Sequence, residues 1–216
     1  MIEICDIEKP DLKECMESNM LFSSSYEHAR SYGGYAISSF LDSLSIEWAN
    51  CVIDTRFHSL KSGWYPGIPG WHLDDIPRDL DNGQPNLANP KYKSIHRMVI
   101  FDYGTGSMTE FADKKEIEHI NYYKDKSEDF PLNGKTGETL WKTVDDFVNK
   151  TDGFEIKTVE CSKVYEFGIN DLHRAVPATT NGWRFFIRAT RNSERPIHNV
   201  IRNQVQVYMD PINGGW

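Results

Sequence analysis

The sequence predicts a mostly β protein of the α+β class, in which many short strands form a sandwich or small barrel behind one or two N-terminal helices. Fifteen Gly and ten Pro interrupt the 216 residues, a pattern typical of short strands joined by turns. Hydrophobic residues make up 39% and aromatic residues 12%, so the chain can bury a sizeable core. Apolar residues at helical spacing occur mainly in the first 50 positions.

Residues 1–50 are expected to form an N-terminal helical cap. A short helix is predicted to begin near Lys9-Pro10-Asp11-Leu12, with Asp11 close to its N-terminus. A second, amphipathic helix is predicted over Tyr35 to Ala49, because its apolar residues recur every three or four positions. These residues are Ile37, Phe40, Leu41, Leu44 and Trp48.

Residues 51–216 are expected to form the β core, so that cap and core together make a single domain. Residues 113–152 are charged and have little strand pattern, and we interpret them as an insertion or lid with a short helix over 140–148. Strands are predicted at 51–58, 94–101, 107–112, 155–159, 162–167, 171–177, 183–190 and 204–209.

The charge and the cysteines limit the classes of function. The formal net charge is −8 and no dense Lys/Arg block occurs, whereas duplex nucleic-acid binders need basic groups for the phosphates. We therefore expect a small-molecule or short cationic substrate and no duplex nucleic acid. Four cysteines without a CxxC pair, no leader pattern and no long apolar run predict a cytoplasmic protein that does not contact a membrane. The sequence does not predict the oligomeric state.

Two histidines and one carboxylate are the candidate metal ligands. His72 and Asp74 form an HxD pair, and alternate residues of a strand point to the same face. His173 lies in a predicted strand about a hundred residues downstream. Two His and one carboxylate on one face of an octahedron leave three positions open, as in non-haem Fe(II) oxygenases. For the HxD pair alone, a structural interpretation is equally good, with His72 lining a turn after the Gly/Pro segment 63–70.

A third feature is the strand predicted over 183–190. Its alternation places Arg184, Phe186 and Arg188 on one face. Two arginines beside an aromatic ring are costly to bury without a partner, and a dicarboxylate would supply one. The nucleophile elbow GxSxG, the Walker A loop and the GxGxxG fingerprint are absent from the sequence, which removes common rival enzyme classes.

Together, HLD (72–74), His173, Arg184 and Arg188 resemble the Fe(II)/2-oxoglutarate-dependent dioxygenase superfamily, in particular its taurine dioxygenase-like and phytanoyl-CoA hydroxylase-like members. The resemblance covers roughly residues 52–190. It implies a double-stranded β-helix (jelly-roll, cupin-like) core and catalysis with Fe(II), 2-oxoglutarate and O₂. It also implies that His72, Asp74 and His173 are the catalytic metal ligands.

The same resemblance assigns residues to 2-oxoglutarate. Arg184 is expected to hold the 5-carboxylate, and Arg188 is the alternative because its RxT sequence resembles the RxS pairing of these enzymes. Thr109 is the third candidate, since residues 106–111 are similar to a strand of the phytanoyl-CoA hydroxylase-like members. The carboxylate at Asp74 is unlike the halogenase branch, and it favours a hydroxylase of a small-molecule substrate. Two alternatives remain open: a cupin-like metal enzyme that does not use 2-oxoglutarate, and a non-catalytic β-barrel that binds a small ligand.

Overall fold

The computed structural model describes residues 1–77, 79, 81, 85–86, 93–113 and 140–209. It is a mostly β structure with few helices and antiparallel sheets, as the sequence predicts. The middle of the predicted insertion, residues 114–139, lies outside the described residues. The end of the insertion contains the expected helix, α5 (Leu140–Lys150).

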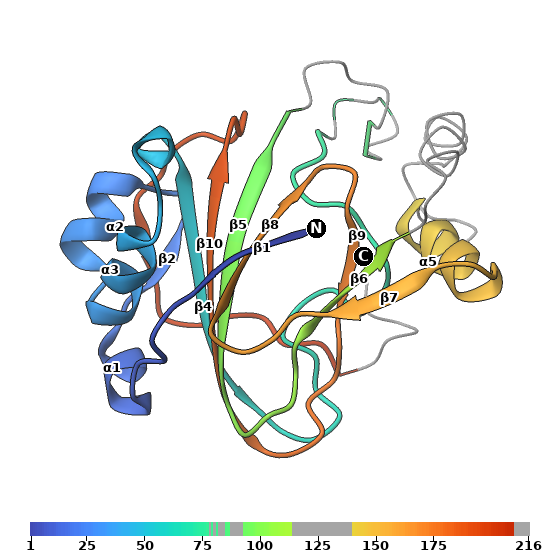
Figure 1. The fold of residues 1–216 in the computed structure, drawn as a ribbon, viewed down its shortest axis with the longest axis horizontal. Helices are drawn as coiled ribbons and strands as arrows, with labels where there is room; N and C mark the ends of the chain where they lie inside the picture. Colours follow the sequence, from blue (N-terminus) through green and yellow to red (C-terminus); the bar gives the residue numbers. More distant parts are fainter. Residues whose placement is uncertain (78, 80, 82–84, 87–92, 114–139, 210–216) are drawn as a thin grey trace.

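Six antiparallel strands form the larger sheet, with the long strand β10 inside it (Figure 1). Their spatial order is β1 (Ile2–Asp6), β8 (Lys163–Gly168), β5 (Ile95–Tyr103), β10 (Gly182–Arg191), β4 (Val52–Leu60) and β3 (Ser24–Ser25). Strand β10 pairs with β4 on one side and with β5 on the other along nearly its whole length. Residues on β10 are therefore the most firmly placed in the sheet.

The two faces of β10 have opposite characters. Phe185, Ile187 and Ala189 are completely buried in the main hydrophobic cluster, which includes Ile37 and Phe40 of the helical segment. Arg184, Phe186 and Arg188 point to the other face, as the alternation predicts. One face of the sheet is therefore covered by the helices (Figure 1). The other face carries the two arginines together with a hydrophobic cluster that includes Met98 and Ile100 of β5.

The helices of the first 50 residues are α1 (Leu12–Glu17), α2 (Tyr26–Tyr32) and α3 (Tyr35–Asp42). The predicted start of α1 is confirmed. Asp11 accepts a hydrogen bond from the Glu14 N–H at 2.7 Å, and the Glu14 carboxylate accepts one from the Asp11 N–H at 2.8 Å. This reciprocal capping box satisfies two backbone donors that the helix itself cannot pair. The same 50 residues also supply β1 and β3, so they are not purely helical.

The prediction of one continuous helix over Tyr35 to Ala49 is wrong, because α3 ends at Asp42. The Ser43 hydroxyl donates a hydrogen bond to the Phe40 carbonyl at 2.7 Å, and serine side chains compete in this way with backbone hydrogen bonds of a helix. A short 3₁₀ turn, Ile46–Trp48, follows and still buries Trp48. The apolar spacing thus identified the buried residues correctly, although the helix is shorter.

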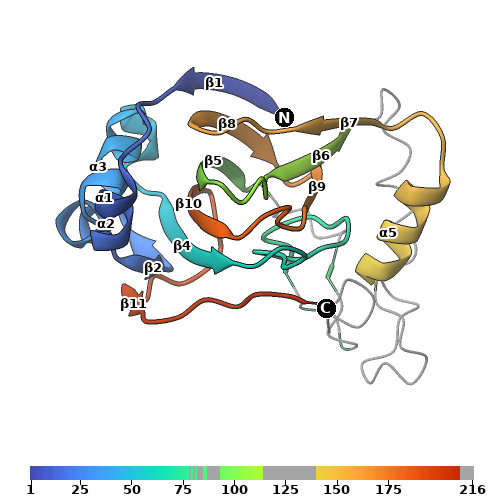
Figure 2. The same ribbon diagram turned by 90° about the horizontal axis from the view of Figure 1, so that it is seen from below.

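A smaller antiparallel sheet lies on the side of the molecule away from the N-terminal helices (Figures 1 and 2). Its order is β7 (Glu155–Thr158), β6 (Thr109–Asp113) and β9 (Leu172–Ala175). Helix α5 packs against it through a second hydrophobic cluster. The buried members of this cluster are Trp71, Leu73, Ala112, Trp141, Val144, Val148 and Leu172. These contacts fix the segment around His72 against β9.

The predicted last strand over 204–209 is also wrong. Among the described residues, this segment makes one isolated bridge, between Tyr65 and Tyr208. The last strand of the described residues is instead β11 (Val200–Arg202), which pairs with β2 (Met20–Phe22). Proline has no backbone N–H, so Pro66 next to the bridge cannot continue a ladder. The chain at 204–209 is therefore extended without being part of a sheet.

The stability of the fold is expected to depend on the helix-covered face of β10. Ile187→Ala should lower the free energy of unfolding by about 2–5 kcal/mol, because it removes a buried side chain from a close-packed cluster. Ile46→Ala is the matched control, since Ile46 is 91% exposed, and its effect should stay within about 0.5 kcal/mol. Denaturant unfolding measures both. Equal effects of the two substitutions would contradict the packing described here.

Candidate metal centre

A strand had been expected at the HxD pair. The pair instead lies at the end of an irregular segment. His72 makes an isolated antiparallel bridge to His173, with backbone N–O distances of 3.0 and 3.1 Å in the two directions. Asp75 has a positive φ of 61°, so the chain turns directly after Asp74. The single bridge nevertheless holds the two histidines opposite each other.

The three predicted ligands come together as a group that could hold a metal ion. Their candidate ligand atoms all lie within 4.8 Å of one another. His173 Nε2 is 3.3 Å from Asp74 Oδ2, and His72 Nε2 is 3.9 Å from Asp74 Oδ1. Nitrogen and oxygen ligands bind transition metals at about 2.0–2.2 Å, so an ion between these atoms requires only small movements. That the three residues bind a metal stays a prediction.

Backbone carbonyls fix the orientation of both imidazole rings. His72 Nδ1 lies 2.8 Å from the Gly70 carbonyl oxygen, and His173 Nδ1 lies 2.9 Å from the Asp171 carbonyl oxygen. A carbonyl only accepts hydrogen bonds, so each Nδ1 carries the proton. Each Nε2 is then the ring atom that faces Asp74. Metal-binding histidines are commonly oriented by such a second hydrogen bond.

The electrostatics favour the protonation states that ligands need. Burial lowers the pKa of His72 to about 4, and the neighbouring His173 contributes to the same shift. Burial would raise the pKa of Asp74, but Arg188 and His173 hold it well below its usual range. At neutral pH His72 is therefore a neutral imidazole and Asp74 a carboxylate, which is how both residues bind metals.

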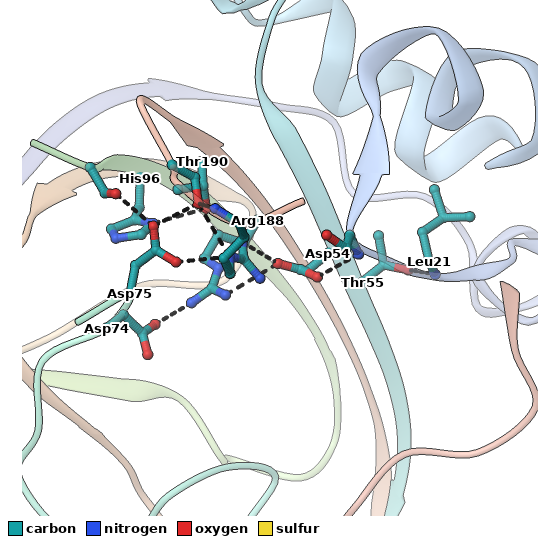
Figure 3. Close-up of polar contacts among 12 residues, drawn as sticks. Leu21, Asp54, Thr55, Asp74, Asp75, His96, Arg188 and Thr190 are labelled. Carbon is teal, nitrogen blue, oxygen red and sulfur yellow. Dashed lines mark hydrogen bonds and ion pairs between the residues drawn. The ribbon is translucent and has the colours of Figure 1, made fainter. Parts of the chain in front are cut away.

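Arg188 connects Asp74 to a buried chain of charges (Figure 3). Its guanidinium bonds Asp74 through Nη1 and lies 3.2 Å from Asp54 Oδ2 through Nη2. Asp54 also accepts from Arg195 at 2.9 Å, and Arg195 Nε donates to Asp75 at 2.8 Å. Burial opposes ionisation of Asp54, but Arg188 and Arg195 lower its pKa to about 2. Arg188 is thus neutralised by two carboxylates.

An inner cavity of about 150 Å³ lies between the two sheets and reaches the candidate ligands. Arg184 and Thr109, both predicted to contact 2-oxoglutarate, line it. Arg184 is 3% exposed, and its Nε donates to the Ser107 carbonyl at 2.8 Å. Burial lowers the pKa of Arg184 to about 9, and the nearby Arg56 adds to the shift. The inner cavity thus contains a cation that is costly to bury.

No carboxylate of the described residues forms an ion pair with Arg184. Asp102 faces it on the neighbouring strand, but its carboxylate accepts hydrogen bonds from the backbone N–H groups of Thr105 and Gly106, at 3.1 and 3.0 Å. Arg184 and Arg188 therefore differ sharply although they share a strand face. Arg188 is paired with acids, whereas Arg184 is open to an acid from outside the chain.

A larger outer cavity of about 630 Å³ adjoins the same centre. The two cavities share His72, Asp74, Arg188 and Ile68, so two of the three candidate ligands lie where the cavities meet, and His173 lines the inner one. The outer cavity has both acidic and basic residues in its wall, together with apolar ones. These include Asp75, Ile76, Lys93, Trp141, Glu194 and Arg195.

Sequence reasoning missed three charged residues of the site: Asp54, Arg56 and Arg195. A signal for two of them was present. Asp54, Arg56 and His58 alternate along β4, so they share the face that looks toward Arg184 and Arg188. Arg195 follows β10 in a turn, and no periodic pattern identifies it.

Trp71 and His96 are buried residues near the candidate metal group. Trp71 is 1% exposed and donates through its indole to Asn149 at 3.2 Å, which supports a packing role rather than substrate contact. His96 is completely buried, stacks on Phe167 and contacts Thr190 Oγ1 at 3.0 Å, so within the described residues it is not in the candidate metal group.

No protein-family model matches the sequence, and no curated protein matches it. Among solved structures, the chain is similar to a non-haem monooxygenase, ThoJ in a complex with nickel, at 10% identity over 88% of this chain and 71% of that chain, with a TM-score of 0.41. It is also similar to apo KdoO, a Kdo hydroxylase and non-haem Fe(II) α-ketoglutarate-dependent dioxygenase, at 9% identity, 84% and 75% coverage and a TM-score of 0.43.

A third similar structure is an oxidoreductase of the 2OG-Fe(II) oxygenase family from Burkholderia pseudomallei, at 11% identity, 86% and 69% coverage and a TM-score of 0.32. These structural neighbours are non-haem Fe(II)/2-oxoglutarate-dependent oxygenases and related non-haem oxygenases, the group that the sequence resembles. Among the described residues, no helix is long and apolar enough to cross a membrane.

Metal binding is expected to need all three candidate ligands. His72→Ala, Asp74→Ala and His173→Ala should each lose most of the affinity for Fe(II), because two remaining ligands hold the ion poorly. Anaerobic calorimetric titration with Fe(II) measures this. His198→Ala is the control, since that exposed side chain lies outside the group and its loss should change nothing. Normal Fe(II) binding by His173→Ala would show that the assignment is wrong.

The charge chain predicts an acid-dependent stability. The folded pKa of Asp54 is about 2, below its ordinary 3.8, so its contribution is present above pH 4 and is lost as pH falls toward 2. Asp54→Asn should destabilise the protein at pH 7 by about 3 kcal/mol, because Arg188 and Arg195 each lose one of their two carboxylate partners. Denaturant midpoints at pH 7, 4 and 2.5 should show the difference shrinking on acidification. A constant difference would contradict the paired state of Asp54.

Proposed function

We propose that the protein is an Fe(II)- and 2-oxoglutarate-dependent oxygenase that hydroxylates a small molecule and releases succinate and CO₂. One observation carries this proposal. Two histidine Nε2 atoms and a carboxylate converge in the wall of the inner cavity, and the same wall contains the guanidinium of Arg184 without a carboxylate partner in the described part of the chain.

The donor set fits ferrous iron. Two neutral imidazoles and one carboxylate form the facial set that leaves three positions for cosubstrate and O₂. The protein retains Asp74 as a carboxylate through Arg188, and it orients each imidazole through a backbone carbonyl. His72, Asp74 and His173 would hold the iron, which with 2-oxoglutarate and O₂ supplies an oxidant strong enough for an unactivated C–H bond.

The inner cavity fits a short dicarboxylate. Arg188 stands at the level of Asp74, and Arg184 lies four residues away on the same strand face, roughly 13 Å along β10. The Arg184 side chain would span part of this distance, and a dicarboxylate held at the metal would span the rest. Thr109, which lines the same cavity, would contact the ligand from the smaller sheet. Because Arg188 is paired with two acids, Arg184 is the better anchor for the 5-carboxylate.

In the same proposal the two facing sheets are the halves of a double-stranded β-helix. The larger sheet supplies Arg184 and Arg188, and the smaller sheet supplies His173 and Thr109. The outer cavity would hold the substrate, because it meets the inner cavity at His72 and Asp74. Its wall of acids, bases and apolar groups suits a polar small molecule better than a nucleic-acid duplex.

The residues would divide the work of the reaction. Arg184 binds and orients the cosubstrate, and the buried cavity wall keeps water from it. Arg188 keeps Asp74 ionised and in place, and Asp54 holds Arg188. The net reaction consumes one O₂, one 2-oxoglutarate and one C–H bond, and it yields succinate, CO₂ and one C–OH group.

The two alternatives predict different measurements. A metal enzyme without 2-oxoglutarate would bind Fe(II) and form no succinate, and a ligand-binding barrel would bind no Fe(II) at this site. The unpaired Arg184 favours the oxygenase, because neither alternative requires a buried cation in the cavity.

Arg184→Met is expected to raise the apparent KM for 2-oxoglutarate by about 10- to 150-fold, because a charge-assisted hydrogen bond contributes about 1.5–3 kcal/mol. Succinate release measures this, and Fe(II) affinity should be unchanged. Arg30→Met is the control, since Arg30 is an exposed arginine of α2 that lines neither cavity. If Arg184→Met is silent and Arg188→Met gives the phenotype, the two arginines exchange roles.

A further inference from the structure

We propose that Arg56 is a second cosubstrate-binding residue, which holds the carboxylate of 2-oxoglutarate nearer the metal while Arg184 holds the far one. This inference rests on the proposed function and adds a residue that neither the sequence pattern nor the resemblance assigns. It follows from the position of Arg56 on β4, from its lack of an acidic partner and from the charge of the inner cavity.

The strand register places Arg56 midway between the two arginines of β10. On β4, Asp54 lies opposite Arg188, Arg56 opposite Phe186, and His58 opposite Arg184. Each two-residue step along a strand is roughly 6.6 Å. Arg56 therefore stands one step from the level of Arg188 and the candidate metal ligands, and one step from the level of Arg184.

The Arg56 side chain reaches across the cavity toward β9. A Cβ built on Gly67 would lie 4.0 Å from Arg56 Nη1 and 3.6 Å from the Ala175 Cβ. Ala175 is two residues beyond His173, so it shares the strand face of that candidate ligand. The guanidinium of Arg56 thus lies one strand step beyond His173, between the candidate metal ligands and Arg184.

Arg56 has no acidic partner in the part of the chain that the structure describes. Of the four arginines that line the inner cavity, Arg174 is paired with Glu110, and Arg188 with Asp54 and Asp74. Arg56 and Arg184 form no ion pair with a described residue. Burial lowers the pKa of Arg56 and Arg188 adds to this effect, and the carboxylates of Asp74 and Asp54, with which Arg56 forms no ion pair, oppose it only in part.

Two uncompensated guanidiniums at different depths match a dianion with a carboxylate at each end. A single anchor would suffice for a monoanion, and the second buried cation would then only cost stability. A fork of N–H donors binds a carboxylate in the plane, which also fixes the rotation of the group. Arg56 would in this way orient the 2-keto acid end of the cosubstrate at the metal.

The test compares two ligands on metal-loaded, anaerobic protein by calorimetric titration. 2-Oxoglutarate has both carboxylates, and pyruvate has the 2-keto acid end alone. Arg56→Met should weaken the binding of both ligands by about tenfold or more, the effect of losing one charge-assisted hydrogen bond. Arg184→Met should weaken 2-oxoglutarate similarly and leave pyruvate unchanged. Arg30→Met is the control, because Arg30 is an exposed arginine of α2 that lines neither cavity, and it should bind both ligands as the wild type does.

Other outcomes would overturn the inference in distinct ways. Unchanged binding of both ligands by Arg56→Met would exclude a role in ligand binding. Loss of 2-oxoglutarate binding with normal pyruvate binding would place Arg56 at the far carboxylate, contrary to the inference. Wild-type protein that binds Fe(II) but not 2-oxoglutarate would refute the proposed function itself, and the inference with it.

Folding of the variant is checked separately. Arg56→Met should have the thermal stability of the wild type or higher, because it removes a buried cation that lacks an acid. Arg56→Lys keeps the charge and loses the planar fork, so it should bind both keto acids more weakly than the wild type but better than Arg56→Met. If both variants bind the keto acids equally weakly, the planar fork and not the charge alone is needed. If both bind them as the wild type does, the inference is overturned.

Discussion

The ion pair between Arg188 and its two carboxylates is the interaction on which the rest of the site depends. Arg188 lies in the middle of β10, where a guanidinium without acids would be severely destabilising. Asp54, on the adjacent strand, fixes Arg188 from the sheet, and Asp74, on the loop, is drawn to it from outside. Because Asp74 follows His72 by two residues, this attraction also helps to bring the loop against β9.

The long strand β10 performs two tasks through its alternation. Phe185, Ile187 and Ala189 fill the cluster beneath the N-terminal helices, and this packing keeps the strand rigid. The opposite face can then present arginines at fixed positions, since the backbone does not move to relieve their desolvation. A rigid sheet thus carries a cavity wall with more positive charge than a flexible segment would tolerate. Rigid support of this kind is what binding sites with fixed geometry require.

The arginines of the inner cavity fall into two groups with different consequences. Arg174 and Arg188 are paired with acids of the chain, so they hold the structure together. Arg56 and Arg184 have no such acid among the described residues and raise the positive potential inside the cavity. Such a cavity favours a small dianion through both charge and geometry. Whether an arginine is paired depends on which acidic residues the neighbouring segments bring close to it, rather than on the arginine itself.

The sequence by itself determined which residues share a face and which types of group are present. Alternation predicted the common face of Arg184, Phe186 and Arg188, and Asp11 predicted the start of the first helix. The predicted end of the helix that begins at Tyr35 and the predicted strand over 204–209 were wrong. Ser43 competes for a backbone hydrogen bond of the helix, and Pro66 interrupts the strand pairing. Local patterns are set by neighbours in the chain, so they can be read from it.

Only the tertiary structure decided which distant residues meet. The contact of His72 with His173 depends on one backbone bridge between segments about a hundred residues apart, and the HxD pair is not even in a strand. Pairing of β10 with β4 and β5 decided that Asp54 would neutralise Arg188, while Asp102 is engaged by its own turn and leaves Arg184 open. Periodicity along one strand fixes the direction of a side chain. It does not fix which strand lies beside it, because that choice depends on the packing of the whole chain.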